Sequence, residues 1–187
     1  MTIDDREIRQ IVQNVIQNMT EPQGESIPVS SSAQPSGKKI VALGADHGGF
    51  ELKEILKTEI SMLGFGVNDV GTNSKEPVDY PDFAHAVAQS VSAGKAWRGI
   101  MIDGAGIGSC IVANKVPGVR AGMAYDVSSA SNSREHNDTN VLTLGAGLIG
   151  VNLAKQIVKV WLTTDFGGDR HTKRVDKIKS VEKMYLK

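Results

Sequence analysis

The feature that most constrains this chain is a regular alternation of short apolar runs and amphipathic segments across residues 38–187. The apolar runs predict strands over 39–43, 67–70, 99–102, 119–124 and 141–144. Helical spacing of apolar residues predicts helices over 50–63, 83–91, 107–114, 127–134, 153–162 and 174–185. A strand-helix alternation of this kind favours parallel strands, because each helix carries the chain back across the sheet. We therefore predict an α/β fold: a parallel sheet of roughly five strands, with helices on both faces.

The segment before this domain has a different character. Within residues 1–19, one apolar stripe at helical spacing predicts an amphipathic helix; it consists of Ile8, Ile11, Val12, Val15, Ile16 and Met19. Residues 20–37 contain ten Pro, Gly or Ser residues among eighteen, which is typical of a flexible linker. The helix either docks on its own core or a sister subunit, or it binds in a groove of another protein. A membrane surface is the weakest alternative, because three acidic residues outnumber two arginines in the helix.

Charge and cysteine content exclude several classes of protein. The 21 basic residues balance the 21 acidic residues, so a general nucleic-acid-binding surface is not expected. A single cysteine, Cys110, rules out an internal disulfide and fits a reducing compartment. No apolar run approaches the roughly 20 residues of a membrane span. The N-terminus also lacks the basic start and apolar stretch of a secretory signal. We expect a soluble intracellular protein with no membrane partner.

Two motifs follow predicted strands directly. The first strand leads into Asp46 and His47 among glycines, and the third leads into the segment DGAGIG that starts at Asp103. In such folds ligands bind beyond the carboxyl ends of the strands, so we expect the candidate residues to gather there. Alternating glycines at a strand-to-helix turn allow backbone N–H groups to face an anion. The alternatives are that Asp46 only caps the next helix and that Asp103 is a solvated turn residue.

Two further clusters carry polar chemistry. His136 and Asn137 lie in the segment SREHND, where a histidine is able to exchange protons near neutral pH. Arg170 and Arg174 are four residues apart, so they share one helix face if the last helix begins there, and they could together hold a phosphate. The alternatives are a helix-terminal histidine bonded to backbone and a basic surface turn. No helical metal-binding spacing of histidines occurs, so no metal is predicted.

Taken together, the motifs resemble one family. The segments GADHGGFELK, DYPDFA, RGIMIDGAGIGSCIVANKVPGVRA, SREHNDTNVL and GGDRHTKRVDKI are similar to the ribose-5-phosphate isomerase B / galactose-6-phosphate isomerase family, in colinear order over essentially all of 38–187. The resemblance implies a Rossmann-like three-layer α/β/α sandwich that interconverts aldose and ketose phosphates without metal or organic cofactor. It also implies a homodimer or homotetramer whose active sites are shared between subunits.

The resemblance further implies individual roles. It assigns a catalytic role to His136, which would assist the opening of a cyclic sugar. The amides of the three glycines after Asp103 would stabilise an enediolate oxygen. Binding of the substrate or its phosphate is implied for Asp46, His47, Tyr80, Gly104, Gly106, Gly108, Asn137, Arg170 and Arg174.

The sequence departs from the family pattern at the position of the base. Many members carry a cysteine base where this chain has Asp103, and another branch carries a glutamate where it has Ser109. A carboxylate can remove a proton next to a carbonyl, so Asp103 is the favoured base. Cys110 is the rival, and a chain without a competent base is the third possibility. Many members also carry a phosphate-contacting arginine where this chain has Leu148.

These departures leave the substrate open. Ribose 5-phosphate and ribulose 5-phosphate are the first expectation. A tetrose or deoxy-sugar phosphate is the alternative, and a catalytically weak core kept for binding or assembly is the second. The N-terminal helix and linker resemble encapsulation peptides of bacterial microcompartment enzymes. That resemblance implies shell or cargo proteins as partners of residues 1–19, and a location in the cytoplasm inside a microcompartment.

Overall fold

The computed structural model describes residues 37–186. The helix expected over 1–19 therefore lies outside the described residues, as does the linker expected over 20–37 except for its last residue. The elements follow in the order β1 (Ile40–Ala45), α2 (Phe50–Met62), β2 (Gly66–Asp69), α3 (Tyr80–Ser92), β3 (Arg98–Asp103), α4 (Ile107–Ala113), β4 (Ala121–Met123), α5 (Val127–Asn137), β5 (Val141–Gly145), α6 (Val151–Thr163) and α7 (Asp169–Tyr185).

The five strands form one parallel sheet in the order β2-β1-β3-β5-β4, as the alternation predicted. Strand β3 lies at the centre, paired with β1 on one side and β5 on the other. The last residue of β3, Asp103, is in register with Gly145 at the end of β5. The carboxyl ends of these strands therefore meet at one edge of the sheet, which we call the carboxyl edge; the opposite edge is the amino edge.

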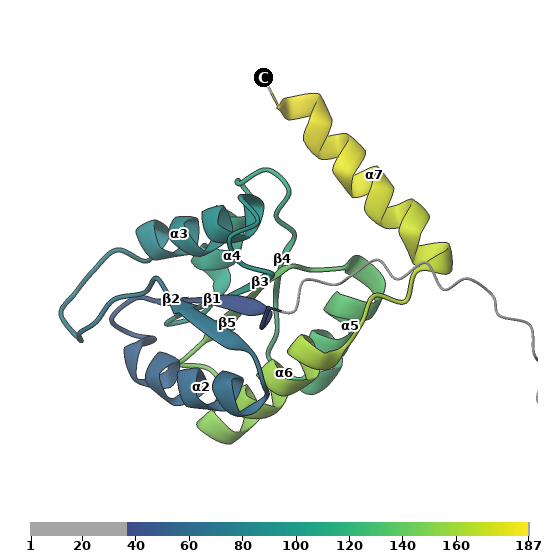
Figure 1. Ribbon diagram of the computed structural model, residues 1–187. Coiled ribbons are helices and arrows are strands. Elements are labelled where there is room, and N and C mark those ends of the chain that lie inside the picture. Colours follow the sequence, from purple (N-terminus) through teal and green to yellow (C-terminus); the bar gives the residue numbers. More distant parts are fainter. Residues whose placement is uncertain (1–36, 187) are drawn as a thin grey trace, which may run out of the picture. The chain divides into compact units, whose positions relative to one another are not determined.

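Helices cover both faces of the sheet, so the three-layer α/β/α sandwich is confirmed (Figure 1). One apolar core lies between the sheet and helices α2, α5 and α6, and the other lies beneath α3 and α4. Neighbouring residues of a strand serve opposite cores: Leu43 and Ile102 face the first, while Ala42 and Met101 face the second. This alternation follows from the two-residue period of a strand that is buried on both sides.

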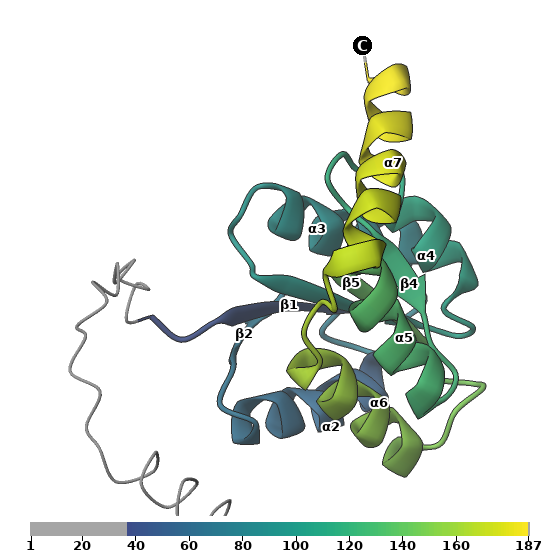
Figure 2. The same ribbon diagram turned by 90° about the vertical axis from the view of Figure 1, so that its right-hand side faces the viewer.

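Helix α7 is the exception to this layered packing. Figures 1 and 2 both show it projecting from the domain, in contact with the rest mainly near its N-terminal end. There His171 and Val175 are buried. Farther along the helix, apolar residues are exposed, and Tyr185 reaches 82% exposure. A helix with an uncovered apolar side is a surface that a partner can bury.

Three predicted helix boundaries were wrong by three residues or more. Helix α7 begins at Asp169, five residues before the predicted start, α3 begins at Tyr80 instead of 83, and α5 ends at Asn137 instead of 134. In α3 and α7 the apolar period begins later than the helix, because most side chains of the first turn are exposed or only partly buried. Within residues 37–186, no helix combines the length and the apolar character needed to cross a membrane.

Candidate active site at the carboxyl edge of the sheet

Asp46 begins the turn that follows β1. Its backbone N–H donates to the carbonyl of Ile102 on β3, and its Oδ1 accepts a hydrogen bond of 2.9 Å from the N–H of Gly49. A side chain on Gly49 would strike the Ile102 carbonyl, since a Cβ would lie 2.7 Å from the carbon of that group. Gly49 is the residue before α2, so the capping alternative for Asp46 has some basis: the carboxylate binds the residue at which the helix starts. The turn holds the buried carboxylate beside the end of β3.

His47 contacts the loop that leads into α3, whose first residue is Tyr80. Nδ1 of His47 is 3.2 Å from both the amide nitrogen and the carbonyl oxygen of Val78, two residues before Tyr80. The Tyr80 ring lies against Gly108, where an added Cβ would be 2.5 Å from the phenol oxygen. Gly108 thus lets the tyrosine hydroxyl approach the turn after β3. The structure brings His47, Tyr80 and Gly108 to one place.

Asp103 ends β3 and is only 5% exposed. Its Oδ1 accepts hydrogen bonds from the N–H groups of Ala105, at 2.8 Å, and Gly106. Its Oδ2 accepts bonds from the N–H of Ser109, at 3.2 Å, and from the Ser109 hydroxyl. A carboxylate has about four acceptor directions, so these four donors use all of them. Asp103 is therefore not a solvated turn residue; it is the centre of the turn.

The glycines after Asp103 correct one expectation. Gly106 has a φ of 78°, in the left-handed region, and a Cβ there would be 2.9 Å from the Leu144 carbonyl carbon. This backbone turns the Gly106 N–H toward Asp103, so that amide is occupied and does not face an enediolate. The sequence could not reveal this, because the same glycine pattern binds either an external anion or an internal carboxylate.

Cys110, the rival base, faces another part of the domain. Its Sγ lies 3.6 Å from the carbonyl oxygen of Ala121 on β4 and 3.6 Å from the side-chain nitrogen of Asn114. Burial raises the pKa of the Cys110 thiol, which disfavours the thiolate. These contacts favour a structural thiol over a base.

The second polar cluster lies where α5 ends and α7 begins. The imidazole rings of His136 and His171 are stacked, with centroids 4.1 Å apart and planes 8° from parallel. Nδ1 of His136 is 2.8 Å from the side-chain nitrogen of Asn132, and Nε of Arg170 is 3.3 Å from Nε2 of His171. Burial, followed by the neighbouring His136, Arg170 and Arg174, lowers the pKa of His171.

Arg170 and Arg174 both lie in the first turns of α7, because that helix begins at Asp169. The predicted four-residue spacing on one helix is therefore present. Asn137 is the last residue of α5. Buried Arg134 holds the chain just after Asn137 in place by donating to Oδ1 of Asp138, at 2.9 Å, and to the carbonyl of Thr139.

The expectation that all candidate residues gather at the carboxyl edge was wrong. Helix α5 starts after β4 and runs back across the sheet to the start of β5. Its 11 residues span about 16 Å, so His136 and Asn137 lie at the amino edge. Arg170 lies there as well, since the Gly167 N–H donates to the Glu135 carbonyl at 2.9 Å. One chain thus carries Asp103 at one edge and the arginines at the other. This follows because the connecting helices run antiparallel to the strands of the parallel sheet.

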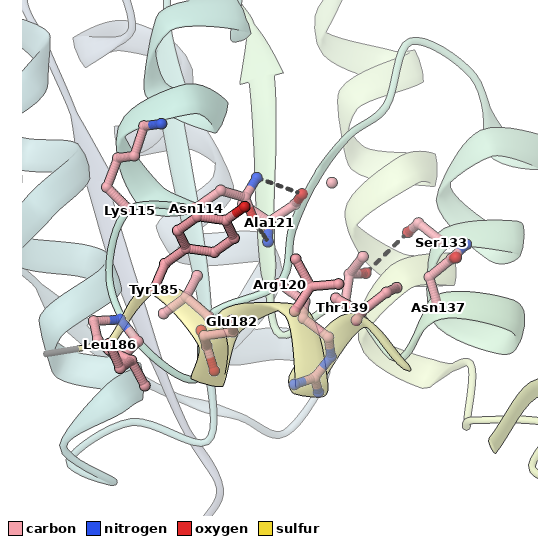
Figure 3. A pocket seen from close by; sticks show the side chains of 15 residues that line it. Asn114, Lys115, Arg120, Ala121, Ser133, Asn137, Thr139, Glu182, Tyr185 and Leu186 are labelled. Carbon is pink, nitrogen blue, oxygen red and sulfur yellow. Dashed lines mark hydrogen bonds between the residues drawn. The ribbon is translucent and has the colours of Figure 1, made fainter. Parts of the chain in front are cut away.

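A groove of about 740 Å³ also lies at the amino edge, between α7 and the body of the domain (Figure 3). Asn137 and Thr139 line it from the domain, and Ile178, Val181 and Tyr185 line it from α7. Glu182 anchors α7 across it by accepting a 2.8 Å hydrogen bond from the Gly118 N–H. Its apolar helix wall is typical of a surface that binds protein.

Three residues near these clusters were not assigned a role from the sequence. Ser109 binds Asp103, and His171 stacks on His136. The hydroxyl of Tyr125, just after β4, lies 3.1 Å from the Met123 sulfur and 3.5 Å from the Ala105 carbonyl oxygen. The position of Tyr125 after a strand was a signal that sequence reasoning could have used. The Ser109 contact had no such signal, because it depends on the turn geometry.

In the part of the chain that the structure describes, no three His, Cys, Asp or Glu side chains are grouped so that they could hold a metal ion. The polar groups at the carboxyl edge are instead two carboxylates, an imidazole and two phenols. Such groups bind hydroxyl and carbonyl oxygens and transfer protons.

Comparison with known proteins agrees with this chemistry. A family profile described as Ribose/Galactose Isomerase matches residues 41–178. Ribose-5-phosphate isomerase B of Escherichia coli is 44% identical over 77% of this chain and 97% of its own length. D-erythrulose-4-phosphate isomerase of Pectobacterium atrosepticum is 40% identical over 74% of this chain and 91% of its own. The solved structure of Clostridium thermocellum ribose-5-phosphate isomerase B has a TM-score of 0.77 at 46% identity, covering 79% of this chain and 99% of that one.

Proposed function

Since the chain belongs to the ribose/galactose isomerase family and is an aldose–ketose isomerase of sugar phosphates, we propose that it interconverts ribose 5-phosphate and ribulose 5-phosphate without a cofactor. The observation that carries this proposal is the turn after β3: Asp103 lies at its start, and both Tyr80 and the loop that begins at Asp46 lie against it. Relatives of 44% and 46% identity are named for this reaction, which supports the choice of a pentose.

In the proposed reaction, Asp103 removes the proton from the carbon next to the sugar carbonyl. The electron pair of that C–H bond forms the carbon–carbon double bond of an enediolate, and the carbonyl oxygen takes the negative charge. The hydroxyl proton on the carbon that lost its hydrogen then passes to this charged oxygen, and Asp103 returns its own proton to the neighbouring carbon, so that aldose becomes ketose with no net change in the enzyme. Asp46, His47 and Tyr80 bind the sugar oxygens at this edge, and Gly104 and Gly108 supply amides.

The remaining roles belong to the amino-edge cluster. His136 assists opening of the cyclic sugar, Asn137 binds hydroxyls, and Arg170 with Arg174 binds the phosphate. A cationic pair on one helix face is suited to a dianionic phosphate. These residues act on the same sugar as Asp103 only if the two edges come from different subunits.

We therefore propose that a second copy of this chain completes each site, in a homodimer or in a homotetramer built from such dimers. A two-fold axis allows the amino edge of one subunit to face the carboxyl edge of the other, and the reverse, so that both sites form at once. Exposed apolar residues support this arrangement: Ile107 and Ile111 on α4 are 50% and 58% exposed, beside the turn that holds Asp103. The apolar wall of α7 and its groove provide further area (Figure 3).

A tetrose 4-phosphate is the second candidate substrate. The observation that favours it is the 40% identity to a relative named for D-erythrulose 4-phosphate. A four-carbon sugar with its phosphate on the last carbon cannot close a ring, so His136 would then have no ring to open.

For the N-terminal part, we propose that residues 1–19 bind a shell or cargo protein of a bacterial microcompartment, with 20–37 as the linker. The support is the single apolar stripe followed by a segment rich in proline, glycine and serine. This places the enzyme in the cytoplasm, inside the compartment.

Proton NMR in D2O tests the catalytic proposal directly. The full-length protein is incubated with ribose 5-phosphate and, in separate samples, with the phosphates of erythrose, erythrulose, allose and galactose. Deuterium entering next to the carbonyl, together with aldose–ketose conversion, establishes the reaction and ranks the sugars. No exchange with any of these sugars would contradict the proposed function and would favour a core retained for binding or assembly.

A further inference from the structure

The hydrogen bonds of Asp103 raise a chemical problem for any role as a base. All four acceptor directions of the carboxylate are used, so a donor must turn away before an oxygen can take a proton. Three of the donors are backbone N–H groups of Ala105, Gly106 and Ser109. The left-handed Gly106 and the first turn of α4 hold them in place, and an N–H group cannot accept a hydrogen bond.

The fourth donor is different in kind. The Ser109 hydroxyl is the only side-chain group among the four, and it bonds to Oδ2. Rotation about one C–O bond turns its hydrogen away from Oδ2, whereas the backbone donors cannot move without a change in the turn. Ser109 itself is fully buried, so the hydroxyl has no bulk water with which to exchange partners.

We infer that Ser109 is a positioning residue for Asp103, and that its hydroxyl releases Oδ2 as Asp103 takes up the substrate proton. In the ionised state the hydroxyl donates to Oδ2. When the proton moves from the sugar carbon to Oδ2, the electron pair of the C–H bond remains on the sugar, the new O–H faces the sugar, and the Ser109 hydrogen rotates away from that oxygen. When the proton returns to the neighbouring carbon, the hydroxyl rotates back. The hydroxyl thus stabilises the ionised carboxylate, which is the state that removes the proton.

This inference rests on the proposed function, and it extends it to a residue that does not touch the sugar. Ser109→Ala removes the hydroxyl but keeps the backbone donor. Since hydrogen bonds to a charged group contribute strongly, we expect kcat to fall about tenfold or more, with KM changed less than about twofold. Loss of a donor disfavours the ionised carboxylate, so the acidic limb of the kcat–pH profile moves to higher pH.

The experiment compares wild type, Ser109→Ala, Ser109→Thr and Ser90→Ala. Ser109→Thr keeps a hydroxyl and should recover most of the activity. Ser90→Ala is the matched control, because its hydroxyl bonds only to the Ala86 carbonyl within α3, at 2.8 Å. Thermal melting checks folding of each variant. If threonine does not fit the buried position, Ser109→Cys replaces it as a side chain of similar size with a weak donor, and it should behave like Ser109→Ala.

A second readout does not depend on activity. The amide NMR signal of Gly106, whose N–H binds Asp103, reports the ionisation of that carboxylate in a pH titration. Its midpoint should move to higher pH in Ser109→Ala. Unchanged kcat, unchanged pH limb and unchanged midpoint would overturn the inference. If the midpoint moves but the wild-type protein exchanges no deuterium with ribose 5-phosphate or erythrulose 4-phosphate, the proposed function fails and the coupling of Ser109 to Asp103 stands.

Discussion

The imidazole rings of His136 and His171 lie face to face, 4.1 Å between centroids, although the two residues are 35 positions apart in the chain. Their stacking joins the end of α5 to the start of α7. Two imidazoles at this distance cannot both carry a proton without repulsion, so this contact is sensitive to pH.

The pH dependence of stability follows from this contact. Burial first, and then His136, lowers the pKa of His171 in the folded protein, whereas the unfolded chain has the ordinary value of about 6.5. A lowered folded pKa means that the folded state binds fewer protons in this range. The stabilisation that neutral His171 gives the folded protein is therefore present above about pH 6.5, and it is lost as the pH falls through the pKa of His171 in the folded state. Melting temperatures between pH 8 and pH 5 should fall more steeply for wild type than for His171→Gln; parallel curves would contradict this.

Asp103→Asn should abolish the reaction and weaken the fold. An asparagine has one acceptor oxygen, so its NH2 group must face either the Ala105 and Gly106 amides or Ser109. Unsatisfied donors of this kind cost about 1–3 kcal/mol in the free energy of unfolding. Deuterium exchange should fall by at least about 100-fold, as for loss of a general base.

Asp103→Cys is the informative companion variant. It places at the end of β3 the residue type that many members of the family use as the base, so measurable isomerisation should remain. Full activity in Asp103→Asn, with melting unchanged, would show that Asp103 is not the base.

Subunit complementation tests the shared site. Asp103→Asn removes a function of the carboxyl edge, and the double variant Arg170→Ala/Arg174→Ala removes one of the amino edge. If each site combines both edges from different subunits, each variant alone is inactive. Unfolding and refolding an equal mixture should restore about a quarter of wild-type activity, because half of the dimers are mixed and each of those has one intact site. Recovery of no activity, with mixed dimers verified by mass spectrometry, would place each site within one subunit.

Cys110→Ala should leave the exchange rate within about twofold of wild type, since burial raises the pKa of this thiol and its contacts lie toward β4. Loss of the Cys110 side chain from its half-buried position should cost about 1 kcal/mol or less in stability. A large loss of rate with normal melting would make Cys110 the base.

Deletion of residues 1–37 should leave deuterium exchange unchanged while co-localisation with a shell protein is lost. A matched control replaces Ile8, Val12 and Val15 by Ser within the full chain, which removes the apolar stripe but keeps the length. A deleted protein that no longer folds or assembles, judged by circular dichroism and light scattering, would instead show that this helix docks on the domain or on a sister subunit.

Much of this protein follows from local sequence. The alternation of apolar runs with helical periods determined five parallel strands and two covered faces, because each period depends only on residues a few positions apart. The same holds for the placement of Asp46 and Asp103 directly after strands, and for the four-residue spacing of Arg170 and Arg174 on one helix.

Only the tertiary structure decided how these groups combine. The left-handed Gly106 turns three backbone amides and the Ser109 hydroxyl onto Asp103, and no spacing rule distinguishes that from a turn open to substrate. The direction of α5 carries His136 to the edge opposite Asp103, although both look like site residues in the sequence. Periodicity specifies which residues share a helix or strand, whereas the edge of the sheet at which a residue lies depends on how the helices and strands pack.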